Sequence, residues 1–141
     1  SWTEYQNLDY SSATNMNAFL NGCSFEGVNL DSTKLPRILD ASHMFYNLPN
    51  VESVKIGNSK DTEKIKLTNT TGLALKCPSL VTIDLQNTDV SALTADQVVT
   101  MWDSDNFERP LIPYTDAIYE GFSRNTHITD EILNTYKNQN A

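Results

Sequence analysis

A short sequence pattern recurs along the chain, and it limits the folds that the chain can adopt. The three copies occupy residues 77–85 (CPSLVTIDL), 48–56 (LPNVESVKI) and, one residue shorter, 23–30 (CSFEGVNL). Each copy ends in alternating apolar and polar residues, which is typical of a half-buried strand. The last apolar residues of the copies, Leu30, Ile56 and Leu85, follow one another at similar intervals, and the second interval is slightly the longer. A period in the twenties predicts stacked coils, each with one short strand.

The register of the copies predicts which side chains stack inside the coils. One coil cannot bury its inner face alone, so neighbouring coils must cover one another along a parallel strand ladder. We expect the inner stacks Phe19/Met44/Leu73, Cys23/Leu48/Cys77, Val28/Val54/Ile83 and Leu30/Ile56/Leu85. We expect a back wall of Leu35, Ile38, Leu39, Ile65, Leu67, Val90 and Leu93. In this register 77–85 is the last regular strand, and its outer side faces the helical cap.

The segments outside the coils are interpreted as the two ends of a single domain. We assign residues 1–15 to an N-terminal cap, 16–93 to the coils, with an extended polar loop over 57–66, and 94–141 to a helical C-terminal cap. The capping-box pattern Thr94–Gln97 predicts a helix of about two turns that includes Trp102. Pro113 at a first helical position and Thr129 at an N-cap predict two further helices. The period lies in the leucine-rich-repeat range, so the predicted fold is an α/β leucine-rich-repeat solenoid with a helical cap.

Composition excludes several classes of partner. The 141 residues are 39% hydrophobic, which fits one domain with a core. A net charge of −8 argues against a nucleic-acid partner, because the ten basic residues are scattered apart from Lys55, Lys60, Lys64 and Lys66, which are interleaved with Asp61 and Glu63. No apolar run reaches the roughly 20 residues of a membrane span, so we expect no membrane insertion. Cys23 and Cys77 lie two strand steps apart, about 9.6 Å. A disulfide needs Cα atoms within about 7 Å, so we expect buried free thiols.

The residues that often carry chemistry do not form a recognisable site. His43 and His127 lie far apart in the sequence without Cys or carboxylate partners at ligand spacing, and no nucleophile elbow is present. Residues 103–108 (DSDNFE) are compatible with a Ca²⁺ site, but they lack the EF-hand glycine and distal glutamate. A loop capped by Asx-turns is the favoured interpretation. Asn69-Thr-Thr71 is an N-glycosylation sequon. We therefore predict no catalytic residue, no metal and no cofactor.

Two of the coils resemble a known family. Residues 44–56 (MFYNLPNVESVKI) and 75–85 (LKCPSLVTIDL) resemble the BspA-like leucine-rich repeats, whose coils read Met-Phe-x-x-Cys-x-x-Leu-x-x-(Ile/Leu)-x-Leu, and 19–23 (FLNGC) echoes them. The resemblance covers roughly residues 15–93, and it departs from the family pattern at Leu48, where Cys is expected. Such repeats act as adhesion or protein-interaction modules on bacterial surfaces, and they also occur in phage-encoded proteins. The resemblance implies recognition rather than catalysis.

The outward strand positions are the candidate binding residues: Asn29, Ser53, Lys55, Thr82 and Asp84. A shallow strip of small, mixed-charge side chains suits a protein or glycan partner, although such a strip is also compatible with a merely solvated face. A second candidate surface is the aromatic set Trp102, Phe107, Tyr114, Tyr119 and Phe122, most of which we expect in the core of the cap. The leading hypothesis is a non-enzymatic recognition or adhesion module, extracellular or on a cell surface. The alternative is a structural assembly protein of a virion, tail or fibre that self-assembles.

Overall fold

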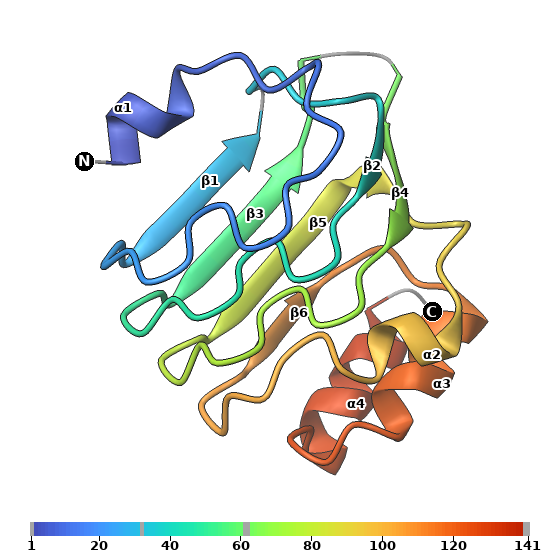
Figure 1. Cartoon of the computed structure of the whole chain (residues 1–141). Coiled ribbons are helices and arrows are strands. Elements are labelled where there is room, and N and C mark those ends of the chain that lie inside the picture. The colour runs from blue at the N-terminus through green and yellow to red at the C-terminus, as the bar shows by residue number, and fades with distance from the viewer. Residues whose placement is uncertain (1, 32, 61–62, 140–141) are drawn as a thin grey trace.

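The computed structural model describes residues 2–31, 33–60 and 63–139. The chain forms a solenoid-like arrangement of about three turns, with a parallel-strand sheet and helices (Figure 1). Residues 1, 140 and 141 lie outside the described residues. So do residue 32 of the predicted coils and residues 61–62 of the predicted loop over 57–66.

The sheet consists of a front ladder and a shorter back ladder that share one strand. The front ladder contains β1 (Gly27–Asp31), β3 (Ser53–Gly57), β5 (Thr82–Asp89) and β6 (Arg109–Leu111), all paired in parallel. The back ladder contains β2 (Ile38–Asp40), β4 (Ile65–Asn69) and the end of β5. Because β5 is eight residues long, it pairs with β3 at its start and with β4 at its end.

The predicted front register is confirmed where the strands pair regularly. Val28 is opposite Val54, which is opposite Ile83, and Leu30 is opposite Ile56. A register shift after Lys55 on the β3–β5 side interrupts the pairing before Leu85, although Leu85 is fully buried. In the first coil Phe19 and Cys23 are only partly buried, whereas Met44, Leu73, Leu48 and Cys77 in the next two coils are fully buried. The first coil has a neighbouring coil on one side only, which explains its greater exposure.

Each coil contains the same turn, in which an Asx-turn is followed by two residues of positive φ. An Asn or Asp side chain accepts a hydrogen bond from the amide two residues later, at 2.8–2.9 Å, and these residues are Asn15, Asp40 and Asn69. Two positions of positive φ follow in each turn: Ala18 and Gly22, His43 and Asn47, then Gly72 and Lys76. Backbone hydrogen bonds join the neighbouring turns, for example from Ala18 N to His43 O at 2.9 Å. The sequon residue Asn69 is therefore the Asx-turn residue of its coil.

The back wall follows the prediction except at Ile38. Leu35, Leu39, Ile65, Leu67, Val90 and Leu93 are buried. Ile38 is 68% exposed, because β2 is a strand in which side chains alternate and Leu39 takes the inward position. The prediction of Ile38 as a back-wall residue is wrong.

The segment after Leu93 differs from the prediction in its strand and its first helix. Strand β6 pairs with β5, with Thr82 opposite Arg109 and Asp84 opposite Leu111, so 77–85 is not the last strand. Helix α2 spans only Ala95–Val98, because the chain then turns and Trp102 bridges in parallel to Ala74. The Gln97 side chain accepts from Thr94 N at 2.9 Å, as the capping box predicts.

Two further helices follow β6, and they lie together with α2 at the C-terminal end of the solenoid, beside β6 (Figure 1). Helix α3 (Asp116–Ser123) begins after the N-cap Thr115, whose hydroxyl accepts from Ile118 N at 3.0 Å, so the prediction of Pro113 at the first helical position is wrong. Helix α4 (Asp130–Asn138) has Thr129 as its N-cap, as predicted. Tyr136 of α4 is fully buried and donates from its hydroxyl to Pro113 O at 2.9 Å.

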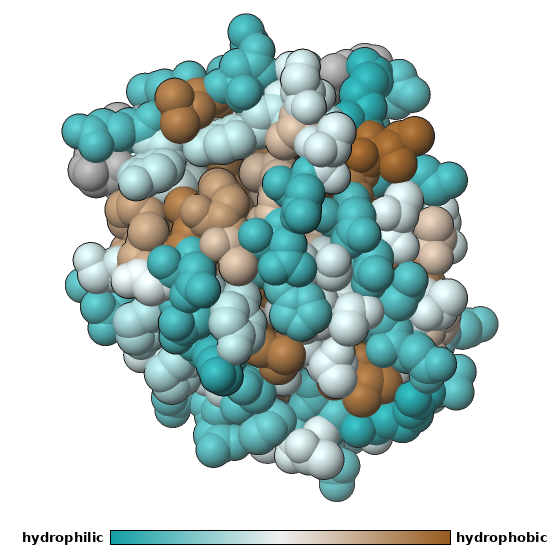
Figure 2. Space-filling model, viewed as in Figure 1, coloured by the Kyte–Doolittle hydropathy of each residue, from teal (hydrophilic) through white to brown (hydrophobic). Residues whose placement is uncertain are grey.

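The N-terminal end has a thinner cover. Helix α1 (Trp2–Gln6) has five residues, where the sequence indicated no regular element. Trp2 and Tyr5 contact Phe25 edge-on, with ring centroids 5.6 Å apart in each pair. Leu8 is 52% exposed. Hydrophobic residues gather on this side of the molecule, over β1 and the loop of the first coil (Figure 2).

Candidate interaction surface

The five predicted binding residues lie in two rows across the front ladder. One row contains Gly27, Ser53, Thr82 and Arg109, and the next contains Asn29, Lys55, Asp84 and Leu111. The register places successive members of a row on adjacent strands, which are about 4.8 Å apart. We call these two rows the strip. The structure therefore brings the five residues together on one face of the ladder.

An ion-pair network centred on Lys55 organises the second row. The Lys55 Nζ lies 3.2 Å from Asp31 Oδ2 and 3.8 Å from Asp84 Oδ2. The side chains of Asp31 and Asp84 are only 9% and 18% exposed, and that of Lys55 is 32% exposed. Asp31 also accepts from Ser59 N at 2.8 Å and from Asn87 Nδ2 at 3.2 Å. Partial burial shields these charges from water, so the network holds a fixed arrangement with two carboxylates and one ammonium.

Local hydrogen bonds also hold three of the predicted side chains, those of Asn29, Thr82 and Asp84. Asn29 Oδ1 accepts from Asp31 N at 2.8 Å, and Asp84 Oδ1 accepts from Gln86 N at 3.0 Å. The Thr82 hydroxyl donates to Arg109 O at 2.7 Å. Ser53 is exposed at the centre of the first row. The strip is therefore a largely pre-ordered surface, and an ordered surface loses less side-chain entropy when it binds.

Sequence reasoning missed Asp31, which is the nearest carboxylate to Lys55. Asp31 occupies the same strand as Asn29, two residues later, so its side chain lies on the same face. The alternation that selected Asn29 would have selected Asp31 if the strand had been extended by one residue.

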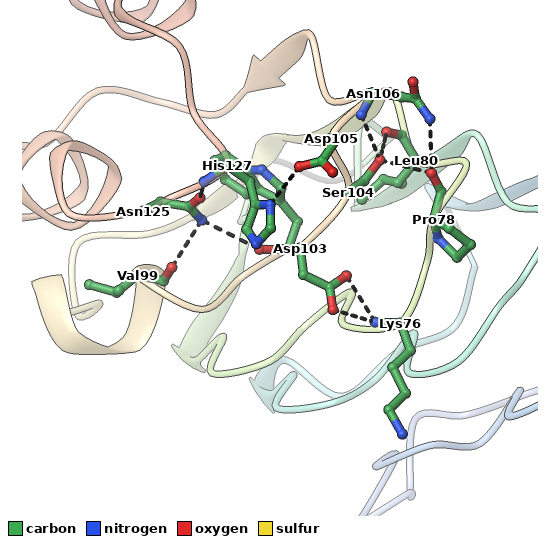
Figure 3. A network of polar contacts seen from close by, with 11 residues as sticks. Lys76, Pro78, Leu80, Val99, Asp103, Ser104, Asp105, Asn106, Asn125 and His127 are labelled. Carbon is green, nitrogen blue, oxygen red and sulfur yellow. Dashed lines mark hydrogen bonds and ion pairs between the residues drawn. The ribbon is translucent and has the colours of Figure 1, made fainter.

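The acidic segment 103–106 ties the third coil to the helices (Figure 3). The Asp103 carboxylate accepts from Lys76 N at 3.0 Å, and the Ser104 hydroxyl donates to Leu80 O at 2.8 Å. Asp105 Oδ1 lies 2.8 Å from His127 Nδ1. The two aspartates thus serve different partners, a backbone amide and an imidazole, and the local turn is made by the Ser104 hydroxyl, which accepts from Asn106 N at 3.1 Å. The segment is a hydrogen-bonded loop as predicted, but the hydrogen bonds printed for its described residues show a serine turn in place of the predicted Asx-turns.

The remaining candidate residues serve the fold. His43 is one of the positive-φ turn residues, and its ring contacts Tyr46 edge-on at 6.0 Å. Both cysteines are free, and Cys77 Sγ donates to Phe45 O at 3.0 Å. Burial raises the pKa of the Cys77 thiol to about 11, which keeps it protonated at neutral pH. Among the described residues, no group of three or more His, Cys, Asp or Glu side chains is placed to hold a metal ion.

The aromatic set of the C-terminal segment is largely core. Trp102, Phe107 and Phe122 are buried, and Trp102 stacks on Phe107 with ring centroids 4.0 Å apart. Tyr114 and Tyr119 are partly buried. Within the described part of the chain, no helix has both the length and the apolar character needed to cross a bilayer.

In comparisons with known proteins, no protein-family model, no curated protein and no solved structure matches the chain.

Proposed function

We propose that the chain is a non-enzymatic recognition module that presents the strip to a protein or glycan partner. The observation that carries this proposal is the row Asn29, Lys55 and Asp84, which is held in register on three adjacent strands, with Lys55 ion-paired to Asp84. An ordered row of mixed charge on an open face offers complementary contacts to a macromolecule, whereas catalysis favours a concave, enclosed site.

The coils themselves are proposed to be leucine-rich repeats of the BspA-like kind. Support comes from the recurring Asx-turn, from the paired positive-φ residues, and from the similar spacing of the front-ladder strands along the sequence. The helices α2, α3 and α4 are then the cap of the C-terminal end. The same resemblance leads us to propose that the module acts outside the cell or on a cell surface.

The test is to block the strip without disturbing its ion pairs. Ser53→Arg puts a long side chain on an exposed position of the first row, whereas Lys55→Ala would leave Asp31 buried without its nearest cation. Wild-type protein is screened against glycan and protein arrays, and each ligand is then titrated against Ser53→Arg and against Thr100→Arg, an exposed position in the turn after α2. We expect Ser53→Arg alone to abolish binding. Ligands that bind Ser53→Arg as tightly as wild type would remove the strip from consideration.

The alternative function is structural assembly, and one observation favours it. Strand β1 ends the strand order, so its outer edge has no strand partner among the described residues. Unpaired edges are templates for association with another chain. Light scattering coupled to size exclusion checks this alternative: concentration-dependent oligomers support it, and a monomer at all concentrations counts against it.

A further inference from the structure

A groove of about 890 Å³ adjoins the strip on the side where the strands begin. One wall is formed by residues at or just before the starts of β3, β5 and β6, including Glu52, Val81 and Glu108. The other wall is formed by Thr129 and the exposed side of α4, including Glu131 and Ile132. Arg109 lines the groove and also belongs to the first row of the strip, so the two surfaces are continuous.

The groove carries an excess of negative charge. Four carboxylate residues line it, Glu52, Asp105, Glu108 and Glu131, against one cationic residue, Arg109. Arg109 is engaged by Glu108 at 3.9 Å. Asp105 is paired with the His127 ring. Neither Glu52 nor Glu131 makes an ion pair within the part of the chain that the structure describes, so both carboxylates are available to a cation.

The groove also offers apolar contact between its acidic walls. Val81 and Ile132 line it from opposite walls, and each is partly exposed. Lysine and arginine side chains lay their aliphatic stems on such surfaces while their charged ends reach carboxylates. A strongly hydrated free cation would gain nothing from Val81 and Ile132, so the lining favours a side chain over an ion.

We propose that this groove binds an extended peptide segment of a protein partner that carries Lys or Arg at alternating positions between aliphatic residues. The inference deepens the proposed recognition function and rests on it. Glu52 precedes β3 and Glu108 precedes β6, so these two residues lie two strand steps apart, about 9.6 Å. Alternate residues of an extended peptide project to the same face about 6.7 Å apart, and the long, flexible lysine side chains span the remaining few ångströms to the two carboxylates. The groove therefore matches a short linear segment that runs across the strand starts.

The experiment is an NMR titration of the whole chain at low ionic strength. The probe is the peptide acetyl-Lys-Val-Lys-Val-Lys-Val-amide, and the comparison peptide replaces each Lys by Glu. We expect saturable shifts of the amides of Glu52, Val81 and Glu131 with the lysine peptide alone. We expect Glu52→Gln and Glu131→Gln each to weaken binding roughly two- to fivefold, as for exposed ion pairs, and added salt to weaken it further.

The matched control is Glu120→Gln, which makes the same charge change at an exposed position on α3 outside the groove. Equal weakening by Glu120→Gln would show a nonspecific effect of net charge and would overturn the proposal. Equal binding of the glutamate peptide, or no saturable binding of the lysine peptide, would overturn it as well. In those cases an array ligand whose binding Ser53→Arg abolishes would leave the recognition function standing, whereas the failure of both experiments would remove both proposals.

Discussion

The two ends of the solenoid are closed in different ways. At the C-terminal end the chain adds β6 and then α3 and α4, and the aromatic rings of Trp102, Phe122 and Tyr136 are fully buried there. At the N-terminal end the cover is the five-residue helix α1, whose Trp2 is only partly buried against Phe25. Isolated helices of this length are marginal in water, so α1 depends on its aromatic contacts.

The difference shows which end of the ladder remains open to another chain. The edge strand β6 contains Pro110, which donates no backbone hydrogen bond, and α4 packs close to β6. The edge strand β1 contains no proline, and its outer side lacks a strand partner among the described residues. Natural edge strands are protected by proline and by covering helices, and here that protection is concentrated at one end. Any stacking of copies should therefore use the N-terminal end.

Replacing each of the two tryptophans by alanine is the strongest test of the difference between the two ends. Trp102→Ala should lower the free energy of unfolding by about 3–5 kcal/mol, because it empties a fully buried site between Phe107 and Phe122. Trp2→Ala should cost about 1 kcal/mol, the scale of an aromatic pair at a partly exposed site. Urea denaturation of both variants measures the two values. Equal losses would contradict the asymmetry of the ends.

Substitutions of two glycines, one near each end, test the same difference with a smaller expected loss of stability. A Cβ on Gly121 would lie 2.0 Å from Val98 Cγ2 and 2.6 Å from Ala95 O, so Gly121→Ala must separate α3 from α2. We expect a loss of about 1–3 kcal/mol, as for overpacked cores. Gly22 of the first coil has open space around its Cβ position and a φ of +80°.

Gly22→Ala is the matched control for Gly121→Ala. It introduces backbone strain of about 1 kcal/mol without a clash. Gly22→Asn should cost less, since Asn47 holds the equivalent left-handed position in the next coil. Thermal unfolding of the three variants tests this order. A Gly121→Ala variant as stable as wild type would mean that α2 and α3 are not tightly packed.

The smallest expected effect is a difference in the pH dependence of stability between a cysteine of an interior coil and a cysteine of the first coil. The pKa of Cys77 is raised from 9.0 to about 11 by burial, so the folded state holds the proton more tightly than the unfolded state. This contribution to stability is complete below about pH 9 and is lost as the pH rises towards 11. Cys77→Ala should therefore flatten the decline in unfolding free energy between pH 9 and pH 11.

The control for that measurement is Cys23→Ala, because Cys23 is partly exposed in the first coil. Its decline between the two pH values should equal that of the wild type. If the unfolding free energy of Cys77→Ala falls with pH as steeply as that of the wild type, groups other than Cys77 cause the loss of stability at alkaline pH.

Much of the front ladder could be predicted from the sequence, because its strands repeat one alternation at a regular spacing. The pairing of Lys55 with both Asn29 and Asp84 follows from that register. The ion pair with Asp31 depended on where β1 ends, and strand ends are set by contacts with neighbours rather than by local pattern.

The prediction failed where tertiary pairing overrides local signals. Strand β6 has three residues with a central proline, and neither feature indicates a strand. The interval from Ile83 to Pro110 continues the coil period, and this spacing was the available signal. Trp102 was assigned to a helix on local pattern, whereas its bridge to Ala74 ends the helical stretch early. The groove lies between the starts of three strands and α4, and no local sequence pattern predicts that these segments lie close together.

Native-state hydrogen exchange tests the central claim, the unequal closure of the two ends, most directly. It reports the free energy of local opening at each amide. We predict that amides of β3 and β5, which are paired on both sides, exchange slowest and that those of α3 and α4 exchange nearly as slowly. Amides of α1 and the first coil should exchange much faster. Protection of α1 and the first coil equal to that of α3 and α4 would contradict the account.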